Sequence, residues 1–140
     1  MTISHNIYPE HSLVYVKFDG SSEIAEFGAY ALSIASEDSR FVKGMNTLLD
    51  ARLANLPPPE PNEHDNFQSF VNKVKERTDQ SPPRKLATVV ADISTFGVSR
   101  QRSVYISEVD GLESRIFFDM GDALTWLDLS PDFEASLTTE

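Results

Sequence analysis

The sequence predicts an α/β protein with a central mixed, mostly parallel five-stranded sheet and about four helices. Apolar runs typical of strands alternate along the chain with segments that repeat apolar residues every three or four positions. Such alternation favours right-handed crossovers and therefore parallel strands. The first two runs lie close enough to form an antiparallel hairpin. The 140 residues suffice for one domain, which we place at 1–130 and expect to be followed by a frayed acidic tail at 131–140.

The first elements in chain order are the N-terminal hairpin and a helix. Residues 3–7 alternate apolar with polar side chains, 9–11 supply turn residues, and 13–18 are rich in β-branched and aromatic residues. A helix over about 22–37 is predicted next, because its apolar residues share one face at helical spacing. Residues 45–50 read as a short strand, and the prolines within 56–61 indicate a stiff loop after it.

The second half of the chain repeats the strand and helix pattern. A helix that begins near Asn62 is followed by residues 86–91, a nearly unbroken apolar run typical of a central strand covered on both faces. We expect a third helix over about 96–109, a last strand over 115–118 and a short final helix from Asp119. One face of that final helix carries Met120, Ala123, Leu124 and Leu127.

Composition excludes several classes of function. The 22 acidic and 12 basic residues give a net charge of −10, which disfavours nucleic acid as a partner. The absence of cysteine excludes disulfides, thiol catalysis and thiolate metal sites. The three histidines lack ligand spacing, so we expect neither a metal nor a cofactor. We find no catalytic constellation, no signal peptide and no membrane span, and we expect a cytoplasmic protein.

Four aspartates stand where strands are predicted to end: Asp19, Asp50, Asp92 and Asp119. They could ring a cation or polar ligand at the carboxyl ends of the strands, whereas the simpler interpretation is that they cap helices or turns. Asp50 differs from the others because a proline-rich loop follows it. We expect Asp50 to pair with Arg52 or with Arg100.

The predicted junctions between strands and helices could also form a ligand site. Arg100, together with Ser94 and Ser99, could hold a carboxylate or phosphate, or Arg100 could simply pair with Asp50 or Asp92. An apolar or amphipathic ligand could instead occupy a cavity between the sheet and the helices, with Arg52 or Arg100 at its mouth. The aromatic residues that would line this cavity are Tyr30, Phe67, Phe70 and Phe96.

Four segments carry a resemblance to a known family: residues 13–20, 41–52, 96–100 and 117–127, the last a strand that runs into an Ala-Leu-Thr-Trp-Leu helix. In this order and spacing the chain resembles the stage II sporulation protein AA-like proteins, which are related to STAS domains (anti-sigma-factor antagonists) and share features with lipid-binding Sec14-type domains. The resemblance implies an α/β sandwich that acts by binding.

In antagonist STAS domains a regulatory serine opens the helix after a central strand, and a kinase partner phosphorylates it. The matching segment here, Asp50–Asn55, contains no serine, so this switch does not carry over. We therefore expect a non-enzymatic regulatory or scaffolding module that contacts a protein partner, with a homodimer also compatible. The alternative is a module that binds a small apolar or amphipathic anionic ligand at the carboxyl ends of the strands.

Overall fold

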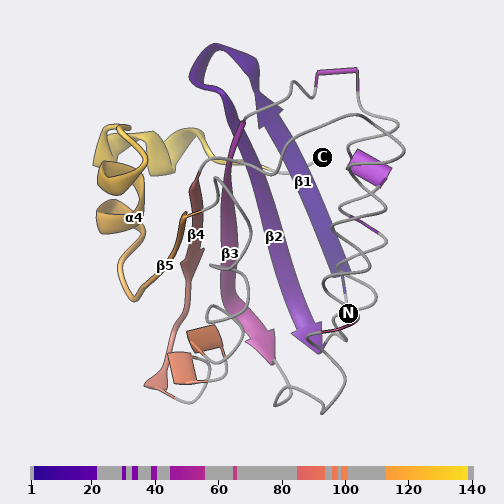
Figure 1. Ribbon diagram of the computed structural model, residues 1–140, viewed down its shortest axis with the longest axis vertical. Coiled ribbons are helices and arrows are strands. Elements are labelled where there is room, and N and C mark those ends of the chain that lie inside the picture. The colour runs from indigo at the N-terminus through magenta and orange to yellow at the C-terminus, as the bar shows by residue number, and fades with distance from the viewer. Residues whose placement is uncertain are drawn as a thin grey trace.

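A computed structural model describes residues 2–21, 30, 33–34, 39–40, 45–55, 65, 85–93, 96–97, 99–100 and 113–138. The strands, in chain order, are β1 (Thr2–Tyr8), β2 (Leu13–Ser21), β3 (Asn46–Asn55), β4 (Lys85–Val89) and β5 (Glu113–Phe117). The described helices are the 3-10 helix η1 (Pro9–His11), the α-helix α4 (Met120–Trp126) and the 3-10 helix η2 (Pro131–Ser136) (Figure 1).

The five strands form one mixed sheet in the order β1-β2-β3-β4-β5. β1 runs antiparallel to β2, with η1 as the turn between them, while β2, β3, β4 and β5 are mutually parallel neighbours. The predicted mixed sheet with an N-terminal antiparallel hairpin is therefore confirmed. The order of the parallel strands follows the chain without a reversal, so the five described strands contain no topological switch point at which a crevice would open.

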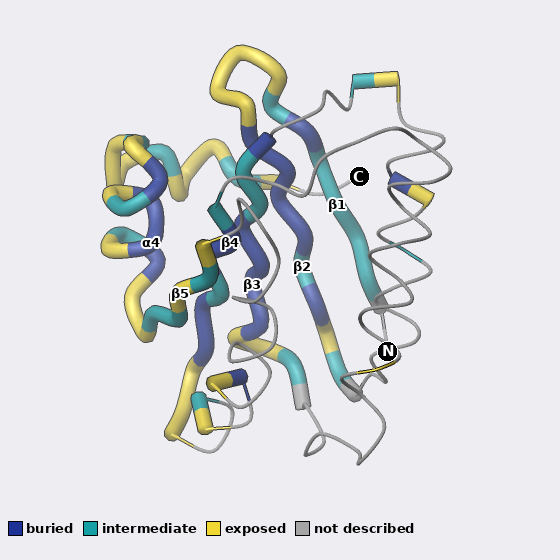
Figure 2. The backbone as a smooth tube through the Cα atoms, in the orientation of Figure 1, coloured by how far each residue is buried: buried dark blue, intermediate teal, exposed yellow. Residues whose placement is uncertain are grey.

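Most residues of the inner strands are buried (Figure 2), and buried apolar residues form a core on each face of the sheet. The first core, on one face, comprises Ile7, Val14, Val16, Phe18, Ile34, Met45, Leu49, Ala51, Leu86 and Val90. The second core, on the opposite face, comprises Leu13, Tyr15, Leu48, Ala87, Val89, Met120, Ala123, Leu124 and Leu127. β4 contributes to both cores and has a strand on each side, which confirms the predicted central strand, although it spans Lys85–Val89 and ends before the predicted residue 91.

α4 packs on the second core at the β5 side of the sheet (Figure 1). Its start is fixed by Asp119, whose carboxylate accepts a hydrogen bond from the Gly121 backbone N–H at 2.7 Å, which is the predicted helix cap. Its end has no basic residue of its own. Instead the Lys85 ammonium donates to the Trp126 carbonyl at 2.9 Å, so β4 supplies the cation that a helix C-terminus favours.

The tail is organised where we expected it to be frayed. Pro131–Ser136 form η2, capped by the Ser130 hydroxyl, and the Phe133 ring packs edge-on against Tyr8 and His11. The Tyr8 hydroxyl donates to the Ser136 carbonyl at 2.9 Å and lies 2.9 Å from the Thr138 N–H. An apolar ring and satisfied backbone groups thus hold residues 131–138 on the sheet.

The other three predicted helices fall mostly outside the described residues. Tyr30, Ser33 and Ile34 are helical, as is Asp65, within the predicted ranges. Helical backbone in the third region begins at Ile93, before the predicted start at 96, because the Phe96 N–H donates to the Asp92 carbonyl at 3.0 Å. Within the described part of the chain, no helix combines the length and the apolar character needed to cross a membrane.

Candidate functional site

Asp50 is the buried charged residue of the described structure, and two side chains donate to its carboxylate. Arg52 donates to it twice, from Nε to Oδ1 at 2.9 Å and from Nη2 to Oδ2 at 2.8 Å. The Tyr15 hydroxyl donates to Oδ2 at 2.8 Å. Arg52 Nη1 also contacts Glu134 Oε2 of η2 at 3.2 Å. The expected pairing of Asp50 with Arg52, rather than with Arg100, is what the structure contains.

A register shift between β2 and β3 creates this arrangement. Lys17 pairs with Asp50, but Asp19 pairs with Leu53, so β3 holds one extra residue across from Phe18. The Arg52 backbone N–H falls within the shift, and Asp50 Oδ1 accepts it at 3.3 Å. The bulge and the ion pair therefore support each other. Our prediction that the strand ends at Asp50 is wrong, since β3 continues to Asn55.

The same shift changes which side chains face the first core. In a regular strand Leu53 would share a face with Ala51, which is buried there. Instead Ala54 packs against the first core and Leu53 is 57% exposed, because one extra residue reverses the alternation.

Asp50, Arg52 and Tyr15 hold one another in fixed ionisation states. Burial alone would raise the pKa of Asp50, but hydrogen bonds from Arg52 and Tyr15 outweigh it and hold this pKa below its usual value. Burial, with the bond to the Asp50 carboxylate, raises the pKa of Tyr15, and the hydrogen bonds to Asp50 raise the pKa of Arg52. Each of these shifts moves the pKa further away from neutral pH, whereas a general acid or base works best with a pKa near the working pH. The cluster is therefore suited to holding β3 and η2 together.

We expect Tyr15→Phe to lower the free energy of unfolding by about 1 kcal/mol, because the carboxylate of Asp50 loses one buried donor. Urea unfolding of Tyr15→Phe, Asp50→Ala and the double variant measures the coupling. In the Asp50→Ala background the loss of the hydroxyl should cost far less, since its acceptor is gone. Equal losses in both backgrounds would contradict the assigned bond.

The other predicted ligand residues are not brought together into one site. Tyr30 and Phe96 both pack against the first core, where Tyr30 Oη lies 2.6 Å from His5 Nδ1. Arg100 is exposed and forms no ion pair or hydrogen bond with the residues that the structure describes. Ser99 is buried, and nothing in the structure explains why its hydroxyl lacks a hydrogen-bond partner. Ser94, Phe67 and Phe70 lie outside the described residues.

The predicted ring of aspartates at the strand ends does not form. Asp50 lies inside β3, and Asp119 caps α4. Asp19 and Asp92 are exposed on different strand ends. Among the described residues, no three carboxylate or histidine groups stand close enough together to hold a metal ion.

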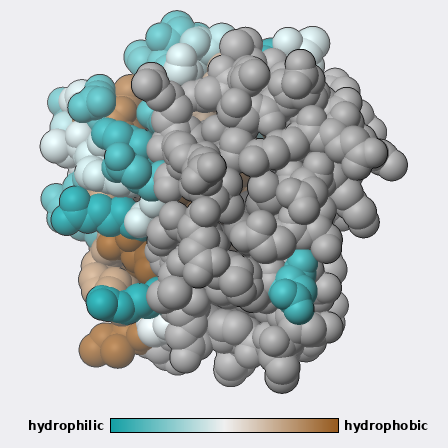
Figure 3. Space-filling view, in the orientation of Figure 1, coloured by the Kyte–Doolittle hydropathy of each residue, from teal (hydrophilic) through white to brown (hydrophobic). Residues whose placement is uncertain are grey.

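Exposed apolar side chains mark a different surface. Leu53, Ile93 and Phe118 are 57%, 82% and 53% exposed, and they are the large apolar residues of the described chain that solvent reaches most. Each lies at or just beyond the carboxyl end of a parallel strand, so all three lie at the same end of the sheet. We call this end of the sheet, with its three exposed side chains, the apolar edge. Figure 3 shows apolar surface at the lower left, over the ends of β4 and β5.

Sequence reasoning missed Tyr15 and Glu134 at the ion pair, and Ile93 and Phe118 at the apolar edge. Tyr15 could have been found, because a phenol in a buried strand needs a hydrogen-bond partner. Glu134 had no such signal, because its segment looked like a solvated tail.

Comparisons with protein-family models, curated proteins and solved structures gave no match to this chain.

Proposed function

We propose that this chain is a cytoplasmic, non-enzymatic, STAS-like regulatory or scaffolding module that acts through contact with a protein partner. The observation that carries the proposal is the apolar edge. Three large apolar side chains are exposed together at one end of the sheet, although both faces of the sheet are covered by packed cores. Large apolar side chains left exposed at the same end of a sheet are a feature of protein interaction sites.

Two further observations favour a partner surface over a small-ligand pocket. The parallel strands follow one another without a reversal, which removes the usual position for a ligand crevice in an open sheet. The predicted ligand arginine, Arg52, has its guanidinium committed to Asp50 and Glu134. The mixed sheet with its N-terminal hairpin agrees with the architecture that the STAS resemblance implies.

The test compares Ile93→Asp with Ala135→Asp, which adds the same charge at an exposed position on η2. The wild-type chain and both variants are incubated with cytosol of the cells that make the protein, and bound proteins are quantified by mass spectrometry. We expect one protein to be retained at least about tenfold less by Ile93→Asp than by the other two, as for an interface hot spot.

Native mass spectrometry of the same samples addresses the alternative function. A small molecule retained by wild type and by Ile93→Asp alike, with no protein that distinguishes them, would replace the partner proposal with ligand binding.

A further inference from the structure

We propose that the surface formed by Ile93, Gly97, Arg100 and Phe118 binds an acidic peptide segment of the partner, one that places a carboxylate beside an aliphatic or aromatic side chain. This inference rests on the proposed function and adds the chemical class of the partner. We call these four residues the helix–edge surface.

Three residues of the helix–edge surface lie on one face of the helix that follows β4. Ile93, Gly97 and Arg100 are spaced four and three positions apart, which is one face of an α-helix. All three are exposed, whereas Phe96 and Ser99 between them face inward. Phe118 joins this surface from the end of β5, because its ring stacks on Phe96 with centroids 5.0 Å apart.

Gly97 forms a notch in this surface. A Cβ atom added at Gly97 would meet no heavy atom within 4 Å, so the space above its backbone is open. The exposed side chains of Ile93 and Arg100 stand on either side of it along the helix. A peptide backbone or an apolar side chain can therefore approach the helix closely between an apolar and a cationic group.

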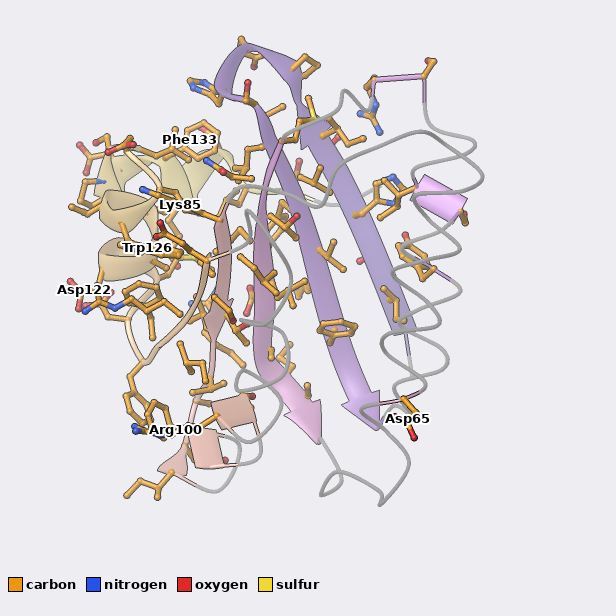
Figure 4. All side chains as sticks on the ribbon, in the orientation of Figure 1. Asp65, Lys85, Arg100, Asp122, Trp126 and Phe133 are labelled. Atoms are coloured by element: carbon orange, nitrogen blue, oxygen red, sulfur yellow. The ribbon has the colours of Figure 1, made fainter. Side chains whose placement is uncertain are left out.

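Arg100 determines the charge of the proposed occupant. Figure 4 shows its side chain at the outer margin of the molecule, and it has no partner among the described residues. A cation within the first two turns of a helix opposes the helix dipole and gains from an added anion. The carboxylate of Asp119 is already used by the Gly121 N–H, and Asp92 has interactions of its own. Since these two described carboxylates have other partners, an anion from another molecule can compensate the charge of Arg100.

The combination selects a peptide carboxylate over other anions. A net charge of −10 repels polyanions such as nucleic acid and anionic membranes more strongly than a segment with a single carboxylate, which one arginine can pair. Exposed Ile93 and Phe118 beside Arg100 instead match a segment in which an acidic residue adjoins apolar ones. An arginine with apolar neighbours is also a common hot-spot composition.

The experiment selects random peptides displayed on phage against the wild-type chain, followed by affinity measurements with the selected peptides. Arg100→Gln removes the charge. Gly97→Glu fills the notch and puts a carboxylate three positions before Arg100, where it can pair within the helix. Gly97→Glu should fold, because its Cβ meets open space and glycine is a poor helix former. Ala135→Glu is the matched control on η2.

We expect the selected peptides to combine Asp or Glu with aliphatic or aromatic residues. Their affinity should fall at least about tenfold for Arg100→Gln and for Gly97→Glu, as expected for loss of a charge-assisted contact, and remain unchanged for Ala135→Glu. Selection of no peptide, of basic peptides, or of peptides whose affinity ignores both substitutions would overturn the inference. A cytosolic partner that is lost with Ile93→Asp but retained by Arg100→Gln would leave the proposed function standing and remove this inference alone.

Discussion

Replacing Asp50 with asparagine is expected to lower the free energy of unfolding by about 2–3 kcal/mol at neutral pH. The carboxylate is buried and accepts bonds from Tyr15, from the Arg52 guanidinium and from the Arg52 backbone N–H. The asparagine amide has only one oxygen, so it cannot accept hydrogen bonds from both Nε and Nη2 of Arg52. At least one of these donors therefore loses its acceptor. The Arg52 side chain is 38% exposed, and water can solvate it after the change, which keeps the cost below that of a fully buried pair.

Asp19→Asn is the matched control, since Asp19 is exposed on the neighbouring strand β2. The same chemical change there should alter the free energy of unfolding by no more than about 0.5 kcal/mol. Urea titrations of both variants and of wild type give the comparison. Similar losses at the two positions would contradict a special role for the Asp50 carboxylate in the fold.

The contribution of Asp50 should also depend on pH in a defined direction. Its pKa in the folded chain lies below its ordinary value, so the ionised form is favoured by folding. This stabilisation is complete above the unfolded pKa of about 4 and is lost as the pH falls through the lower folded value. The difference in unfolding free energy between wild type and Asp50→Asn should therefore be constant near neutrality and shrink below about pH 4.

The parts of the fold that follow from local periodicity could be predicted from the sequence. The apolar run at 86–91 allowed β4 to be recognised as a strand covered on both faces, and helical spacing gave the buried face of α4. An arginine partner for Asp50 could also be predicted, but the sequence left Arg52 and Arg100 open as alternatives, and the structure contains the pair with Arg52.

What escaped prediction depends on contacts between distant segments. The extra residue in β3 is defined only by its pairing with β2, so neither the continuation of β3 nor the exposure of Leu53 has a local signal. η2 is short and acidic, and it is ordered by Phe133 against the β1–β2 hairpin. Exposure of Ile93 and Phe118 likewise depends on how the ends of β4 and β5 meet the following helices.

Leu124→Ala is expected to produce the largest loss of stability among single truncations in α4, about 3 kcal/mol. Leu124 is fully buried in the second core, where α4 packs on the sheet, and truncation removes both apolar contact and volume. The better helix propensity of alanine offsets only a few tenths of a kcal/mol. Leu53→Ala removes the same atoms from a side chain that is 57% exposed, and it should cost no more than about 0.5 kcal/mol.

Hydrogen exchange of the Leu124→Ala variant shows how tightly α4 is coupled to the sheet. Leu124 shares the second core with Leu13, Leu48 and Val89 of three different strands, so its loss should weaken protection in β3 and β4 as well as in α4. Faster exchange confined to α4, with an unchanged main unfolding transition, would mean that the helix detaches independently. In that case the second core contributes little to the sheet, contrary to the burial of its side chains.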